Sequence, residues 1–482
     1  MEKRKFTKAT RVQIVYDDPM FMKKDEDGVQ SHVEYRDLCK LLHQLQRENR
    51  TISNFTIRYE HMYKDIEMNF NDKLGHFPSK EEKEELLDGY TSMSGKIYSI
   101  LTKKGFISNK SNMSGAIRLA EKHYKNHLKH ILIGDESLPS YKNNMPIDIA
   151  SQNIIITHEE VDNAEDGKRY TNRYFTISLL NKKDSDAAGY NKTAIRFKCV
   201  VKGKNAGSRS VLSIIDRCES MEYKLCGSKI QYDEQKKKWY LLLTYQHEKE
   251  IELPEDVSED NVIGVHIGVH NAIEAVYGHR PRGFAIEGGE TEKYEEIMAL
   301  RRREIGLLTK KGSLLCGPSR IGHGYKKKMQ PLAKLGHRSS NFRDTVNKRY
   351  AAAIVKEALK AGAGTMNLED LKDLAKEELL YESKLHNWSY YDLTNKIESK
   401  ATEAGMVVHR IDFHKLHRYC PDCNALSVKK EYIRDEDDKI VGFTYQCTEC
   451  RQIIDMDTTA AEQLKRKDIS DILDGFATEE SK

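Results

Sequence analysis

Four of the nine cysteines stand in two closely spaced pairs, and this pattern constrains the fold of the chain more than any other feature. Cys420 and Cys423 form one Cys-x-x-Cys pair, and Cys447 and Cys450 form a second pair after 23 intervening residues. Two such pairs can present four thiolates to one tetrahedral zinc ion. Because four thiolates leave no open coordination position, we predict a structural zinc ribbon over residues 416–452 that performs no catalysis.

The segment before the cysteines alternates between apolar strands and amphipathic helices. We expect two strands joined by a polar turn over residues 261–278, then charged helices over residues 291–308 and 341–360. A short strand over residues 364–368, a helix over residues 388–404 and a last strand over residues 406–411 follow. An acidic segment then enters an alanine-rich helix after the second cysteine pair. This order predicts an RNase H-like α/β domain over residues 256–415, which is completed by residues 453–482 with an acidic tail.

In the N-terminal half, the spacing of apolar residues changes from a helical pattern to the alternation of strands. Apolar spacing predicts a helical domain over residues 33–145, with helices around Leu38–Leu45, Ile57–Phe70 and Met113–Ile131. Short alternating strands predict a small β-barrel over residues 146–255, completed by residues 1–32, and the strands are expected over residues 10–16, 174–180, 194–203 and 239–245. Residues 248–260 have the composition of an acidic linker. We therefore predict a multidomain α+β chain.

Basic residues are concentrated locally although the net charge is only +4. Between Arg301 and Lys360, 16 Lys and Arg residues stand against three acids. Such a surface favours a polyanionic partner such as nucleic acid, and a solvated helix face is the simpler alternative. The candidate nucleic-acid contacts are Arg301, Arg302, Arg303, Lys326, Lys327, Lys328, Arg338, Arg196 and Lys198.

Apolar runs in the chain are all shorter than the ~20 residues that span a bilayer. The first residues also lack the apolar core of a secretory signal. We expect a cytoplasmic protein that has no membrane partner and that joins the nucleoid when bound to DNA.

Three short motifs, read together with the cysteines, resemble those of the transposon-encoded TnpB nucleases and the miniature type V-F CRISPR effectors (the Cas-twelve-f group). They are Gly-Val-His-Ile-Gly around His266, Asn-Leu-Glu-Asp-Leu around Glu369 and Asp-Met-Asp-Thr-Thr-Ala-Ala around Asp457. The resemblance implies a split RuvC nuclease domain with an inserted zinc ribbon, a helical recognition domain and a β-barrel wedge domain. It further implies a guide RNA and target double-stranded DNA as partners, and a homodimer on one guide.

Position 266 departs from the family pattern, because His266 stands where the family has its first metal-binding Asp. A neutral imidazole has one lone pair and no charge, so it cannot bridge two magnesium ions as a carboxylate does. Thr459 and Gln463 also replace residues that are usually Asn in the family. We therefore predict that magnesium is absent or weakly bound at a degenerate site of His266, Glu369 and Asp457, and that the chain is an inactivated nuclease rather than an enzyme.

Two alternatives to an inactive site remain open. Asp455 or Glu274 could occupy the vacant ligand position, or manganese, which tolerates imidazole, could replace magnesium. The leading hypothesis is a guide-directed DNA-binding protein that regulates transcription, by blocking polymerase or by recruiting a sigma factor or RNA polymerase. The alternatives are an active RNA-guided DNA endonuclease with an unusual metal site, and a transposon-associated accessory protein that binds RNA.

Overall fold

The chain folds into two units in this computed structural model. Residues 5–249 form one unit, and residues 250–482 together with the first four residues form the other. The structure describes residues 2–25, 27–162, 169–201, 203, 205–251, 253–267, 271–278, 282–316, 325–370, 388–412, 416, 418–420, 422–423, 425–434, 440–454, 456–466 and 468–469. Within these ranges, every helix is too short or too polar to cross a membrane.

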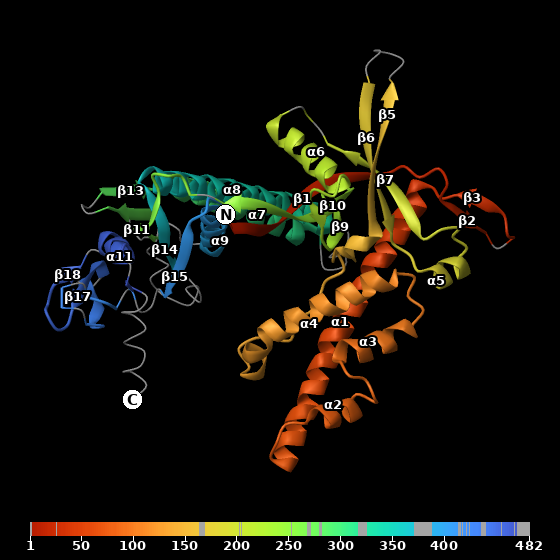
Figure 1. Ribbon diagram of the computed structural model, residues 1–482, viewed down its shortest axis with the longest axis horizontal. Helices are drawn as coiled ribbons and strands as arrows, with labels where there is room; N and C mark the ends of the chain where they lie inside the picture. The colour runs from red at the N-terminus through yellow and green to blue at the C-terminus, as the bar shows by residue number, and fades with distance from the viewer. Residues whose placement is uncertain are drawn as a thin grey trace. The chain divides into compact units, whose positions relative to one another are not determined.

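An eight-stranded sheet forms the centre of the first unit. Its strands follow the order β4, β9, β10, β1, β7, β6, β5, and β8 pairs with β10. They are β1 (Glu2–Tyr16), β4 (Ile147–Ile149), β5 (Ile154–Asp162), β6 (Arg169–Ser178), β7 (Ala194–Val200), β8 (Lys224–Leu225), β9 (Ser228–Asp233) and β10 (Lys238–Ile251). Figure 1 shows β5 and β6 as a long hairpin. Among the described residues the order runs openly from β4 to β5, so closure into a barrel stays a prediction.

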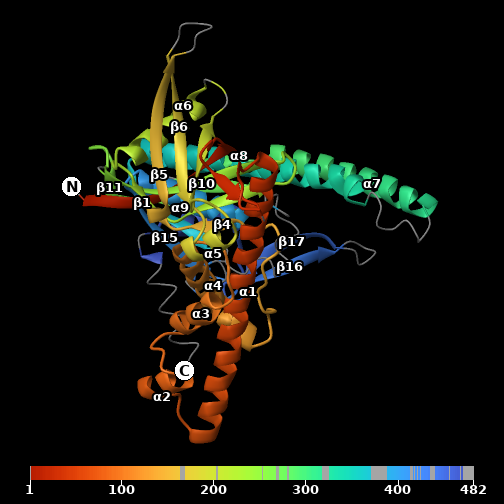
Figure 2. The same ribbon diagram turned by 90° about the vertical axis from the view of Figure 1, so that its right-hand side faces the viewer.

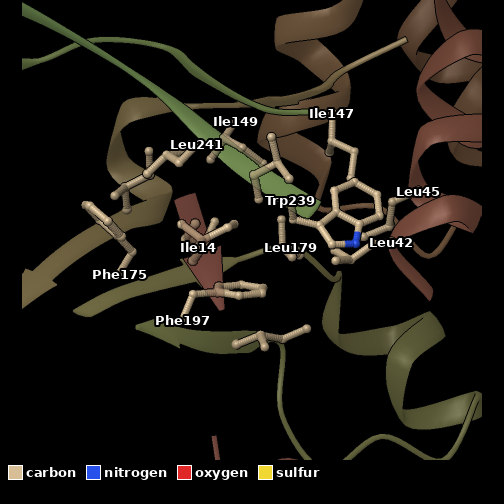
Figure 3. Packing of buried hydrophobic residues seen from close by; sticks show 14 of the residues in the cluster. Ile14, Leu42, Leu45, Ile147, Ile149, Phe175, Leu179, Phe197, Trp239 and Leu241 are labelled. Carbon is tan, nitrogen blue, oxygen red and sulfur yellow. The ribbon is translucent and has the colours of Figure 1, made fainter. Parts of the chain in front are cut away.

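The core of this unit joins the sheet to its first helix. Ile14, Phe197 and Trp239 from three strands pack with Leu42 and Leu45 of that helix (Figure 3). All five side chains are buried, as the alternation along each strand and the helical spacing require. Each buried side chain of this size contributes about 1.5–3 kcal/mol relative to an exposed one, so this core is the main source of stability for the unit.

One continuous helix, α1 (Tyr35–Leu74), replaces the two helices predicted around Leu38–Leu45 and Ile57–Phe70. Because neither Gly nor Pro occurs between its ends, nothing in the sequence interrupts it. The helix ends at Gly75, whose φ of 73° suits a residue without a side chain. The other helices and short strands of the unit are α2 (Lys80–Leu86), α3 (Met93–Thr102), α4 (Lys110–Leu132), α5 (Lys182–Ala187), α6 (Ala206–Glu219), β2 (Met22–Lys24), β3 (Gln30–His32) and the 3-10 turn Ser151–Asn153.

A five-stranded mixed sheet forms the centre of the second unit, in the order β13, β12, β11, β14, β15. The strands are β11 (Ser258–His266), β12 (Ile273–Tyr277), β13 (Arg282–Ile286), β14 (Ala363–Asp370) and β15 (Val407–Asp412). Strands β11, β12 and β13 are antiparallel, whereas β11, β14 and β15 are parallel. The expected strands are thus confirmed, but the acidic linker predicted over residues 248–260 is wrong at both ends, because β10 and β11 extend into it.

Helices cover the two faces of this sheet. The apolar core on one face includes residues of α8 (Tyr325–Lys360) and α9 (Tyr390–Glu403), and α7 (Gly289–Cys316) lies along α8 (Figure 2). Tyr294 of α7 stacks on Phe342 of α8 with ring centroids 3.7 Å apart. The other face carries α11 (Met456–Leu464). A separate three-stranded sheet consists of β16 (Val428–Arg434), β17 (Ile440–Cys447) and β18 (Ile453–Ile454).

Candidate functional site

The four paired cysteines converge, as their spacing predicted. Their sulfur atoms all lie within 4.8 Å of one another. The Sγ atoms of Cys420 and Cys450 are 3.6 Å apart, and those of Cys423 and Cys447 are 3.5 Å apart. Zinc–sulfur bonds of about 2.3 Å in a tetrahedron place sulfur atoms roughly 3.8 Å from each other. The cluster therefore fits a structural zinc ion.

Ser427 prepares one of these thiols for metal binding, and the sequence patterns did not identify it. Its hydroxyl lies 3.0 Å from Cys447 Sγ, and this hydrogen bond, together with the backbone N–H groups of Glu449 and Cys450, lowers the pKa of the Cys447 thiol to about 6. Burial raises the pKa of the neighbouring Cys420 thiol. Since the thiolate is the form that binds metal, Cys447 is ready to bind at neutral pH.

The second candidate centre lies where two parallel strands end. His266 is the last residue of β11, and Glu369 is in β14 beside it. Both side chains are buried, with 1% and 0% of their surface exposed. The Nδ1 atom of His266 lies 2.9 Å from Glu369 Oε2, and the same oxygen accepts a hydrogen bond from the backbone N–H of Ile267 at 3.2 Å.

Helix α11 lies against the same face of the sheet as this pair. A Cβ atom on Gly264 of β11 would be 2.4 Å from the carbonyl oxygen of Ala461, so the helix rests directly on the glycine. Asn367 of β14 donates hydrogen bonds to the carbonyl oxygens of Leu464 and Arg466, at 2.7 and 3.0 Å. Because residues two apart in a strand share a face, His266 and Glu369 face α11 as Gly264 and Asn367 do.

Glu274, His266 and Glu369 form a row of side chains across three strands. Glu274 is the Cα partner of His266 in the antiparallel pair of β11 and β12, and such partners share a face. It is half-buried, and Asn271 Nδ2 lies 3.4 Å from its Oε2. Asp457 is in the first turn of α11, but its side chain lies outside the described residues, as does the whole of Asp455.

The row fits a divalent cation by its chemistry, since it offers carboxylate oxygens and an imidazole nitrogen. Among the described side chains, the four cysteines alone bring three or more ligating atoms within 4.8 Å of one another. The three side chains of the row therefore do not all bring a ligating atom within 4.8 Å of one another. Gln463 of α11 is buried, and its Nε2 lies 3.4 Å from the carbonyl oxygen of Tyr419. This contact gives Gln463 a structural role, in holding α11 against the segment before the cysteines.

The predicted basic contacts have different surroundings. Arg301, Arg302, Arg303 and Arg338 are exposed on α7 and α8, whereas Lys326, Lys327 and Lys328 are in α8 with side chains outside the described residues. Arg302 also lines a polar cavity of about 520 Å³ with Arg343, Ser339 and Asp392.

Two candidate contacts lie on β7, where Arg196 and Lys198 are half-buried. Arg196 lies 2.8 Å from Glu159 and stacks over the ring of Tyr174, 3.7 Å from its centroid. A phosphate would have to compete with Glu159 for this guanidinium, so the contacts of Arg196 are mainly structural.

Comparisons with known proteins place this geometry in context. Residues 390–464 match the family model described as Cas12f1-like, TNB domain. The chain is 30% identical over 441 residues to the CRISPR-associated endodeoxyribonuclease Cas12f1 of Sulfoacidibacillus thermotolerans, covering 92% of this chain and 96% of that protein. It is 30% identical over 318 residues to the Cas12f1 of Syntrophomonas palmitatica, covering 63% and 57% of the two chains.

A solved structure shares the fold. The protein in the cryo-EM structure of a Cas12f1–sgRNA–target DNA complex aligns with 96% of this chain and 99% of its own length, at a TM-score of 0.60 and 17% identity.

The relatives correct one prediction. The sequence argument made the chain an inactivated nuclease rather than an enzyme, yet the related proteins are named endodeoxyribonucleases. That prediction is therefore wrong. It depended on the loss of one family carboxylate at position 266, and the register of β11 and β12 sets another carboxylate, Glu274, opposite His266.

Proposed function

Because this chain belongs to the Cas12f1 family of miniature type V-F CRISPR effectors, we propose that it is a guide-RNA-directed DNA endonuclease with a metal site of unusual composition. Pairing between guide and target strand reads the sequence of the DNA, and the protein reads a short flanking motif. Residues 256–415 and 453–482 form the RuvC-like domain, and residues 416–452 form a zinc ribbon that contacts target DNA. Residues 33–145 form the recognition domain, and residues 1–32 and 146–255 form the wedge domain.

One observation carries the proposal: a row of Glu274, His266 and Glu369 lies at the strand ends, on the face that carries α11. Divalent cations bound there would activate water and stabilise the leaving oxygen of a phosphodiester. Glu369 Oε2 accepts a hydrogen bond from the Ile267 N–H and lies 2.9 Å from His266 Nδ1, so this carboxylate is oriented by the end of β11. Asp457 would add a carboxylate from the first turn of α11. Manganese suits this mixed donor set better than magnesium, because magnesium prefers oxygen ligands only.

Exposed arginines supply the electrostatic part of the function. Arg301, Arg302, Arg303 and Arg338 can neutralise phosphates of the guide or the target, and each such contact makes binding more sensitive to salt. Lys326, Lys327 and Lys328 extend the same basic stretch in sequence. Replacing Arg338 by Ala should weaken binding to every DNA sequence alike, since phosphate contacts carry no base information.

The decisive experiment is cleavage of matched and mismatched duplex DNA by the purified protein–guide RNA complex, first with magnesium and then with manganese. We expect guide-dependent cleavage of the matched duplex in manganese, little cleavage in magnesium, and loss of cleavage in Glu369→Gln. Glu259→Gln is the matched control, because Glu259 is an exposed acid at the opposite end of β11. Specific binding without cleavage in either metal would remove the nuclease from the proposal and retain the guide-directed binding.

The homodimer, the RNA-binding accessory protein and transcriptional regulation are separate expectations. A second copy of the chain on one guide stays a proposal, and the mass of the assembled complex tests it. Specific binding of the complex to the matched duplex would exclude an accessory protein that binds RNA alone. Transcriptional regulation through a sigma factor or RNA polymerase depended on a nuclease that does not cut, so it is left out of the proposal.

A further inference from the structure

We infer that Glu274 supplies the carboxylate that position 266 lacks, and that it binds a divalent cation together with His266 and Glu369. The inference rests on the proposed function, because it concerns the same metal site. It assigns a ligand to a strand, β12, that contributes none of the three family motifs.

Strand register is the first argument. Glu274 stands opposite His266 in β11, and Val265 and Leu368 are partners in the neighbouring parallel pair, so the next residues His266 and Glu369 also stand side by side. The three side chains therefore form one row on one face. Cβ atoms of directly opposed antiparallel residues are about 4.5–5.5 Å apart, which is within the reach of a glutamate.

The spacing of the strands is the second argument. Neighbouring strands are about 4.8 Å apart, so β12 and β14, on either side of β11, are separated by about 9.6 Å. One cation with ligand bonds of about 2.1 Å holds ligand atoms at most about 4.2 Å apart. The Glu274 side chain must therefore lean over His266 toward Glu369 to share the cation, which is within the reach of a glutamate.

The surroundings of the two glutamates differ in a way that suits different roles. Glu369 is fully buried, accepts a hydrogen bond from the Ile267 N–H and lies 2.9 Å from the His266 ring, so it has little room to move. Glu274 is half-buried, and the distance of 3.4 Å from Asn271 Nδ2 is long for a hydrogen bond. Glu274 is therefore the carboxylate of the pair that a cation entering from solvent reaches first, and Glu369 is the buried one.

The contact between His266 and Glu369 determines which nitrogen of the ring can bind a metal. When the proton is on Nδ1, the nitrogen that lies 2.9 Å from Glu369 Oε2, Nε2 has the lone pair. Histidines that ligate metals commonly donate their other N–H to a carboxylate in this way. The donor set is then one imidazole with carboxylates, which favours manganese over magnesium.

Manganese binding tests the inference without relying on cleavage. The zinc-loaded protein–guide complex is titrated with Mn²⁺, and free Mn²⁺ is measured by electron paramagnetic resonance. We expect the dissociation constant for Mn²⁺ to be at least tenfold larger in Glu274→Gln and unchanged in the control Glu259→Gln. Gln has the shape of Glu, and circular dichroism checks that each variant is folded.

A double variant makes the test specific. If Glu274 replaces the family's aspartate, His266→Asp should restore manganese binding to Glu274→Gln, because one carboxylate then substitutes for the other. Unchanged manganese binding in Glu274→Gln, with loss of binding in Glu369→Gln, overturns the inference and leaves the proposed function standing. Absence of manganese binding in the unmodified complex overturns the inference and the metal site of the proposed function together.

Discussion

Substitution of Gly264 by Ala should detach α11 from the sheet that carries the row of ligands. The new Cβ would lie 2.4 Å from the carbonyl oxygen of Ala461 and 2.5 Å from the backbone nitrogen of Lys465. Ordinary contacts begin near 3.4 Å, so the helix must move by about 1 Å. Both atoms belong to the helix backbone, so no side-chain rotation relieves the overlap.

The cost follows from what α11 loses when it moves. Asn367 Nδ2 bonds the carbonyl oxygens of Leu464 and Arg466 at 2.7 and 3.0 Å, and a shift of about 1 Å breaks both bonds. Two lost hydrogen bonds cost about 2 kcal/mol, and the disturbed packing of the helix adds about 1–2 kcal/mol. We therefore expect Gly264→Ala to destabilise α11 by about 3–4 kcal/mol.

Hydrogen exchange of the α11 amides is the suitable assay, because a chain with two units need not unfold in a single step. A loss of about 3 kcal/mol corresponds to roughly 150-fold faster exchange through opening of the helix. Gly283→Ala is the matched control in the same sheet, since its Cβ would meet only the Ala275 carbonyl oxygen at 3.7 Å. Equal exchange in the two variants would refute the contact between α11 and Gly264.

Three further predictions follow from single features. Removal of zinc by a chelator should speed amide exchange throughout β16, β17 and β18 while exchange in β11 stays unchanged, as mass spectrometry of exchanged peptides can measure. Burial raises the pKa of Glu60 from 4.5 to about 7, so the folded state holds a proton that the unfolded state releases, and stability should fall by about 2 kcal/mol as pH rises from 5 to 8. Glu60→Gln should weaken the pH dependence of stability. Urea titrations at pH 5 and pH 8, with amide exchange of α1 as the readout, measure it. Asn347→Ala should destabilise the packing of α8 and α9 by about 2–4 kcal/mol, measured by amide exchange of those two helices, because it leaves the buried indole N–H of Trp388 without its acceptor at 2.7 Å.

Local patterns in the sequence predicted most elements of the second unit. The strands that end near His266 and Glu369 and the helix after Asp457 lie where periodicity placed them, because apolar spacing reports burial directly. The cysteine cluster was predicted for the same reason, since its chemistry depends only on spacing within two short motifs.

Other features depend on contacts between distant residues, and no local pattern reports them. The thiol of Cys447 is tuned by Ser427, which is 20 residues away in the chain. Gly264 is required by the close approach of α11, almost 200 residues later. The apolar spacing predicts two helices where α1 is continuous, because the residues between them are mostly polar; with neither Gly nor Pro among them, the helix is not interrupted.

The identity of one motif residue is a poor guide to the charge of a site built on a sheet. In sequence, His266 replaces an anion and the site loses one of three charges. In the sheet, the partner of His266 across β11 and β12 is itself a carboxylate, so an anion lies about one strand spacing from the position that the family fills with aspartate. Coulomb interactions depend on distance in space and not on position in the chain. A ligand that is lost from one strand can therefore be supplied by its neighbour, provided the register places the two on the same face.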